Sequence, residues 1–224
     1  MNVATHTSSP ASTVASQIDA ERVALLYRLT PMTLATAVIF SAIVYLSLRP
    51  VVDARLLLPW LLLNNLVSLV RYVDIRAYRR AGPPASLAAR WHRRFILLTL
   101  VAGVVWGLMG TLLFPAGHLT HQAAVIVFLI GTAAVGLFTL SSSWPAYLAL
   151  AMPILVPPAL FIMSRDGDGN LAFGAALLFF AVLVLVNSRR SVANTREMLR
   201  LRFENGHIAA EREQALVAAE EAGR

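Results

Sequence analysis

The chain has 224 residues, of which 58% are hydrophobic and only 14% are charged. Water-soluble domains carry about 25% charged residues, so this composition excludes an ordinary soluble domain. All nineteen basic residues are arginine and the net charge is +7, but these arginines flank apolar segments instead of gathering on a polar domain. That placement is typical of membrane orientation and argues against a nucleic-acid partner. The absence of cysteine excludes disulfides and thiolate metal sites.

The first thirty residues divide into two parts. Residues 1–17 are rich in Ser, Thr and Ala and lack the positively charged start of a secretory signal, so we expect them to be disordered. Over residues 18–30, apolar side chains such as Val23 and Leu26 alternate with charged ones such as Arg22. This pattern predicts an amphipathic helix that lies on the inner membrane surface before the first span.

Long apolar segments fill the middle of the chain. Residues 95–164 contain no Asp, Glu, Lys or Arg, and as a helix they would run for roughly 105 Å, about three hydrocarbon thicknesses. The sequence therefore predicts an all-α polytopic membrane protein with a bundle of six transmembrane helices within residues 31–186. The predicted spans are residues 31–48, 56–75, 95–114, 123–140, 144–163 and 171–186.

The arginines are distributed unevenly between the two sides of this bundle. Sixteen lie in the N-terminal segment, the second inter-span connection and the tail after residue 186, whereas Arg49, Arg55 and Arg165 lie on the other side. By the positive-inside rule, both termini are cytoplasmic and the protein lies among the lipids of a bacterial inner membrane. The three outer loops are too short to form a ligand-binding domain, so a stimulus must act within the bilayer or at its surface.

The tail after residue 187 has a different composition. It is rich in Ala, Glu and Arg, which favour a long, water-exposed helix. Leu201, Ile208, Ala215 and Ala222 recur every seven residues, as in a coiled coil. Such a stripe needs a partner helix, so we expect a homodimer. We interpret residues 187–224 as a cytoplasmic signalling helix that leads to an output domain missing from this chain.

A group of polar side chains interrupts the apolar second span. Asn64, Asn65, Ser68 and Arg71 lie within two helical turns, and Trp106 of the third span is a candidate to face the same space. Polar groups in hydrocarbon are costly and find partners. They could form interhelical hydrogen bonds that fix the packing, or they could form an intramembrane polar pocket for a signal molecule.

Two further sets of residues are expected to shape the helices. Three glycines in the third span have the small-xxx-small spacing that permits close helix packing. Three prolines inside the fifth span each remove a helix hydrogen bond, which predicts a kinked or locally unwound helix that could serve as a hinge. These residues are Gly103, Gly107 and Gly110, and Pro153, Pro157 and Pro158.

Two other motifs are interpreted as ordinary loops. His118 and His121 stand three residues apart without a third metal ligand, and the turn at residues 166–170 lacks the glycine and glutamate of a calcium loop. We therefore predict no metal site and no cofactor in this chain. The sequence also lacks a catalytic triad, paired carboxylates and a glycine-rich phosphate loop, so no residue is assigned a catalytic role.

Several segments resemble a known family. The runs WLLLNNLVSLVRYV and RRFILLTLVAGVVWGLMGTLLFP, the proline-bearing fifth span, and the exit sequences LRLRFEN and EREQALVAAEEAGR resemble the six-helix sensor region of bacterial hybrid histidine kinases. Similar regions also precede diguanylate cyclase modules. The resemblance implies a missing output domain that autophosphorylates on histidine using ATP and passes phosphate to a response regulator.

These observations support three hypotheses for function. The leading one is a membrane sensor module of a two-component system that relays a stimulus through its C-terminal helix. The rival is a small transporter or channel subunit, favoured by the polar cluster and the proline-bearing fifth span but disfavoured by the long cytoplasmic helix. The third is a structural membrane scaffold.

The arginine distribution makes a direct prediction about topology. Reporter fusions at residue 85 and at residue 118 should report opposite compartments, with residue 85 cytoplasmic, because the arginine-rich loops stay inside. A pair of alkaline phosphatase and fluorescent protein fusions at each position measures this. The same compartment at both positions would exclude the six-span topology.

Overall fold

The computed structural model describes residues 10–165, 167 and 169–222, and within them all regular secondary structure is helical. The long helices are α1 (Pro10–Leu48), α2 (Ala54–Ala81), α3 (Ala88–Gly107), α4 (Leu119–Thr139), α5 (Trp144–Met163) and α6 (Asn170–Ala222), and the 3₁₀ helices are η1 (Ala85–Leu87) and η2 (Leu108–Gly110). Six segments in this described part are long and apolar enough to cross a membrane. The predicted all-helical fold with six such helices is confirmed.

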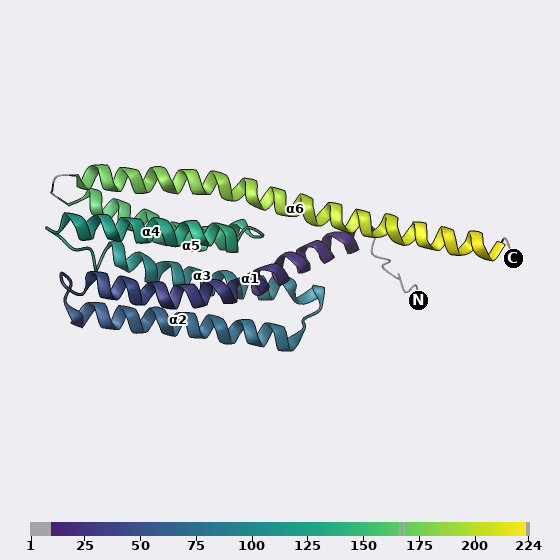
Figure 1. The fold of residues 1–224 in the computed structure, drawn as a ribbon, viewed down its shortest axis with the longest axis horizontal. Helices are drawn as coiled ribbons and strands as arrows, with labels where there is room; N and C mark the ends of the chain where they lie inside the picture. The colour runs from purple at the N-terminus through teal and green to yellow at the C-terminus, as the bar shows by residue number, and fades with distance from the viewer. Residues whose placement is uncertain (1–9, 166, 168, 223–224) are drawn as a thin grey trace, which may run out of the picture.

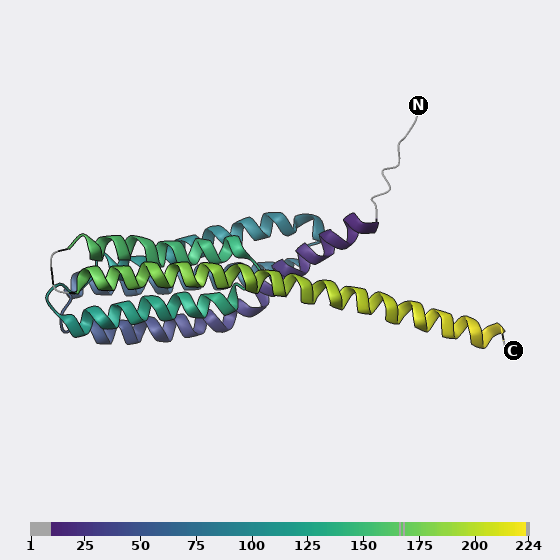
Figure 2. The same ribbon diagram turned by 90° about the horizontal axis from the view of Figure 1, so that it is seen from above.

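The helices run up and down side by side, as Figures 1 and 2 show. The connections α1–α2, α3–α4 and α5–α6 lie at one end of the bundle. The connections α2–α3 and α4–α5 lie toward the other end, where α1 begins and from which α6 continues outward. The arginine-rich segments therefore share one end of the molecule.

Helix α1 is longer than expected at its N-terminus. Residues 10–17, which we expected to be disordered, are helical and continuous with the first apolar segment, while residues 1–9 lie outside the described residues. The N-terminal part of α1 is inclined to the rest (Figure 1), and Pro31 inside the helix removes a backbone hydrogen bond in the way that bends helices. Leu26 and Tyr27 have no exposed surface. The apolar face of residues 18–30 thus packs on the protein, and not only on a membrane surface.

The ends of the shorter helices follow from local chemistry. Asp53 caps α2 by accepting a hydrogen bond from the Arg55 amide at 2.8 Å, and Gly82 ends it in the left-handed conformation with φ of 48°. Ser143 caps α5 by accepting from the Ala146 amide. Helix α3 ends at Gly107 and is followed directly by η2, which ends at Gly110. Residues 111–114 of the third predicted span therefore lie outside these helices.

The glycines of α3 pack closely against the proline-bearing stretch of α5. A Cβ atom at Gly103 would lie 2.8 Å from the Ala149 carbonyl oxygen, which Pro153 deprives of its helix hydrogen bond. A Cβ atom at Gly107 would overlap the Pro153 carbonyl oxygen, which Pro157 leaves free in the same way. The glycine Cα–H groups therefore point at carbonyls that the prolines have freed, a weakly favourable contact.

The prolines do not unwind α5. The helix is continuous from Trp144 to Met163 with Pro153, Pro157 and Pro158 inside it. The third glycine, Gly110, lies against the Pro158 ring. The three glycines thus pack against α5, as expected for residues that permit close helix contact. The hinge function of the prolines stays a prediction.

Helix α6 has no break where the apolar segment meets the charged tail. It runs for 53 residues from Asn170 to Ala222, and Figure 1 shows its C-terminal half leaving the bundle. Val184, Ser188 and Val192 are buried at intervals of four residues, so the packed face continues past the predicted boundary at residue 187. Coiled-coil pairing beyond residue 200 stays a prediction.

The contact between α3 and α5 makes a prediction about stability. We expect Gly107→Ala to destabilise the protein by about 1–3 kcal/mol, because the new methyl group meets backbone that cannot move aside. The matched control is Gly131→Ala on α4, where the nearest atom is the Phe40 ring at 4.0 Å. Thermal unfolding in detergent micelles measures both. Equal midpoints for the two variants would show that the α3–α5 approach is looser than described.

Candidate functional site

A cavity of about 280 Å³ lies inside the bundle, between α1, α2, α3, α4 and α5. Its wall is mainly apolar, with Phe40, Val67 and Leu150 among the lining residues. Four of the five residues predicted to form a polar pocket line it. They are Asn64, Ser68 and Arg71 from α2 and Trp106 from α3. The structure thus brings these residues to one space.

The fifth predicted residue, Asn65, is not part of this wall. Its side-chain amide donates to the Leu61 carbonyl oxygen at 2.8 Å and to the Ser41 hydroxyl oxygen at 3.4 Å. Asn65 therefore ties α2 to α1, which is the packing role that the sequence left open as an alternative.

Asn64 differs from its neighbour in having an unpaired amide. Its side chain lines the cavity and the residue is 2% exposed, yet the Nδ2 atom has no hydrogen-bond partner among the described residues. A buried amide nitrogen without a partner costs about 1–3 kcal/mol. The Nδ2 atom has almost no accessible surface, so an acceptor on a molecule in the cavity would reach it only after neighbouring side chains shift.

Arg71 supplies a positive charge at the same wall. One terminal nitrogen of its guanidinium donates to the Thr99 hydroxyl at 3.2 Å, and the group lies 5.7 Å from the centre of the Phe95 ring. A guanidinium has five N–H donors, so these contacts leave others for a ligand. The hydroxyls of Thr33 and Thr36 add further polar atoms to the wall.

This arrangement is suited to binding a small molecule. An apolar wall with a few polar groups is the usual form of a small-molecule site. Within residues 10–165, 167 and 169–222, no group of three His, Asp or Glu side chains could hold a metal ion. The His118 and His121 rings lie 6.0 Å apart at the far end of the bundle, well away from this cavity's lining residues.

Comparison with protein-family models, curated proteins and solved structures finds no match. The function must be argued from the residues themselves.

A second polar group, which the sequence did not reveal, joins α1, α2 and α3. The Tyr27 hydroxyl donates to the Asp74 carboxylate at 3.0 Å and lies 3.2 Å from the Trp91 carbonyl oxygen. Arg94 forms an ion pair with the same carboxylate, and the Tyr27 ring stacks on Tyr78 with centroids 3.9 Å apart. Asp74 is 2% exposed, so these partners are what makes its burial tolerable.

The only available signal for this group was the acidic residue near the end of a predicted span. A carboxylate there needs a cationic partner, and Arg94 is one of several nearby arginines. Tyr27 joins this group because α2 runs back alongside α1. That arrangement places Asp74 beside Tyr27, although the two residues are 47 positions apart in the sequence.

The difference between Asn64 and Asn65 makes a prediction about stability. We expect Asn64→Leu to stabilise the ligand-free protein by about 1 kcal/mol, because it removes an unpaired buried amide while keeping the same branched side-chain shape next to a cavity that can take the larger methyl groups. Asn65→Leu is the matched control and should destabilise, because it breaks two hydrogen bonds to α1 and the preceding turn. Unfolding midpoints in micelles measure both. A loss of stability in both variants would mean that Asn64 has a partner.

Proposed function

We propose that the chain is the membrane input module of a two-component signalling protein. Six apolar helices support the membrane location, as do large apolar side chains on the outer surface such as Met32, Phe138 and Phe179, which are 66–82% exposed. In water such a surface would drive aggregation, whereas lipid chains solvate it. The arginine-rich end then faces the cytoplasm of a bacterial inner membrane, with both termini inside.

The observation that carries the proposal is the continuity of α6. A helix of 53 residues spans about 80 Å at 1.5 Å per residue. Its first part packs in the bundle and its last part leaves it (Figure 2). A tilt, rotation or shift of the sixth span is therefore carried outward to the end of the helix, which is what an input module must do.

The internal cavity is the proposed site of the stimulus. Its apolar wall, the unpaired Asn64 amide and the Arg71 guanidinium favour a small apolar molecule that carries a hydrogen-bond acceptor. Such a molecule changes output only if it binds one arrangement of the helices more tightly than another. Helix α5 connects the two regions, because Leu150 lines the cavity and Ala159 lies against Gly174 of α6.

The output lies beyond the cytoplasmic end of α6. Met198 and Leu201 are 70% and 48% exposed on the emerging helix, and an apolar stripe there is buried when a second copy pairs with it. A homodimer would place two output domains side by side. By the resemblance noted above, that output is a histidine kinase that uses ATP and a response regulator, or alternatively a diguanylate cyclase.

One observation favours a second candidate, a small transporter or channel subunit. A cavity between five helices, with prolines in α5, is a feature of substrate sites in transporters. The two functions differ in their need for α6 beyond the bundle. A transporter moves its substrate within the transmembrane bundle and does not need the rest of α6. A sensor needs the part of α6 outside the bundle to keep its rotational position relative to the spans.

The experiment that separates them changes this phase. The chain is joined in frame after residue 222 to a histidine kinase catalytic module, and one or seven alanines are inserted after Arg200. One residue rotates everything beyond it by about 100°, whereas seven restore the phase almost completely. We expect one alanine to lock or abolish autophosphorylation and seven to preserve it.

Membrane abundance is measured for every variant, and the seven-alanine insertion is the matched control, because it adds more length while nearly restoring the phase. If one and seven alanines after Arg200 are tolerated equally, α6 does not transmit a signal and the sensor proposal fails. Phase-independent uptake of a solute by the same variants would favour the transporter.

A further inference from the structure

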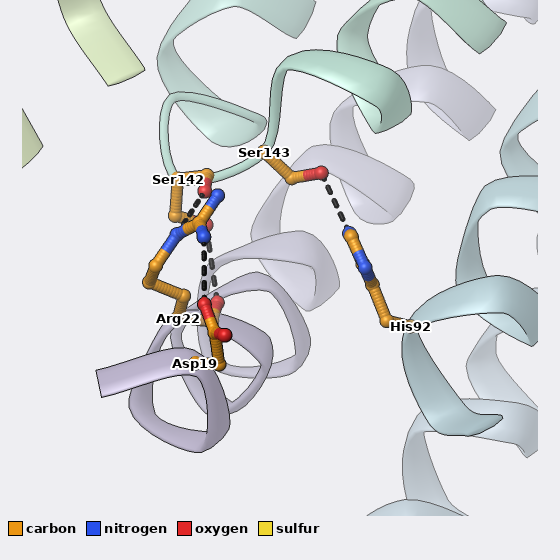
Figure 3. Close-up of polar contacts among 5 residues, drawn as sticks. All are labelled: Asp19, Arg22, His92, Ser142 and Ser143. Carbon is orange, nitrogen blue, oxygen red and sulfur yellow. Dashed lines mark hydrogen bonds and ion pairs between the residues drawn. The ribbon is translucent and has the colours of Figure 1, made fainter. Parts of the chain in front are cut away.

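A second cavity, of about 320 Å³, lies at the arginine-rich end of the bundle. It is formed where the N-terminal part of α1, the start of α3, the α4–α5 connection and α6 meet, well removed from the wall around Asn64. Its polar lining residues are Asp19, Arg22, His92, Ser142, Ser143 and Arg196. Figure 3 shows that five of these, all except Arg196, converge from three separate segments.

Hydrogen bonds hold this cavity's wall in place. Arg22 donates from Nε to the Ser142 carbonyl oxygen at 3.0 Å, and the Ser142 hydroxyl donates back to the Arg22 carbonyl oxygen at 3.1 Å. The His92 Nε2 and Ser143 Oγ atoms lie 2.7 Å apart. These contacts (Figure 3) tie the α4–α5 connection to α1 on one side and to α3 on the other.

The charges around the cavity do not balance. Among its described lining residues, Asp19 is the one carboxylate, and it already pairs with Arg22 at 2.9 Å. Arg196 of α6 faces the same space and is close enough to Arg22 for the two guanidinium groups to repel each other. An anion between the two arginines would turn this repulsion into two attractive contacts.

Helix α5 adds to the positive potential. Its N-terminus opens at the cavity, where Ser143 is the capping residue and Pro145 lines the wall. The first turn of this 20-residue helix carries a partial positive charge, which favours an anion nearby, although Ser143 already accepts from the Ala146 amide. The helix end and the two arginines thus act on the same space.

We propose that this cavity binds a phosphate group. Guanidinium groups match the geometry of phosphate oxygens and form charge-assisted hydrogen bonds with them. The group belongs either to the headgroup of an anionic lipid of the inner leaflet or to a soluble phosphate. Since the cavity wall includes α1, the α4–α5 connection and α6, a bound phosphate bridges Arg22 to Arg196 and fixes α6 where it leaves the bundle. This site is independent of the sensor proposal.

The test uses the full chain in nanodiscs of phosphatidylcholine. One arm replaces a rising fraction of the lipid with phosphatidylglycerol, and the other adds inorganic phosphate at constant ionic strength. The thermal unfolding midpoint, followed against concentration, gives an apparent Kd. A saturable rise is expected in at least one arm, and the arm that shows it identifies the source of the phosphate.

The variants decide whether the arginines of this cavity are responsible. Arg196→Gln removes an exposed charge and should fold normally, and we expect it to weaken binding about tenfold, which is the loss of one charge-assisted contact. Arg190→Gln is the matched control, because it removes the same charge from an exposed position of α6 that does not line the cavity. Its Kd should match that of the unchanged protein.

Two outcomes overturn the proposal. The first is the absence of a saturable rise in either arm. The second is an equal loss of affinity in Arg196→Gln and Arg190→Gln, which would show that phosphate responds only to the total charge of the helix. Arg22→Gln serves as a second variant, with its folding checked separately because it also loses the Asp19 ion pair.

Discussion

The approach of α3 to α5 is the constraint on which the rest of the bundle depends. Three prolines leave carbonyl groups of α5 without helix partners, and the glycines at positions 103 and 107 bring α3 close enough to cover two of them. Apolar helices in lipid gain little from burying more apolar surface, so such close packing is what holds them together. With α3 and α6 on its sides, α5 becomes a central helix, and both cavities have part of their wall on it.

Most buried polar side chains that the structure describes in this bundle are paired, and Asn64 is one of the exceptions. Asp74 is paired with Tyr27 and Arg94, which come from two other helices. The Asn65 amide donates to Ser41 of α1 and to the Leu61 carbonyl oxygen of its own helix. Asn64, one residue away, leaves its amide nitrogen unpaired at the wall of a cavity. Trp144 Nε1 also lacks a hydrogen-bond partner among the described residues, so an unpaired buried atom does not by itself mark a ligand site.

The two cavities stand in different relations to the exit helix. The inner cavity is lined by Leu150 of α5, and α5 in turn packs on Gly174 of α6. A ligand in the inner cavity would therefore affect α6 indirectly, through α5. The outer one includes Arg196 of α6 itself. An apolar molecule in the first and a phosphate group in the second would therefore act on one mechanical element from two depths.

The apolar lengths, the arginine positions and the helix-breaking residues were enough to predict six helices and about half of their ends, because these properties are local along the chain. They also pointed to Asn64, Asn65, Ser68, Arg71 and Trp106, since polar groups in apolar spans are few; all of these except Asn65 line the inner cavity, and ligand binding there stays a prediction. The pairing of glycine with freed carbonyl, the Tyr27–Asp74 contact and the cavity around Arg22 could not be predicted, because each joins segments far apart in sequence. The opposite fates of Asn64 and Asn65 show the reason. Adjacent residues on a helix point about 100° apart, and only the position of the neighbouring helices decides which of them meets a partner and which meets a cavity.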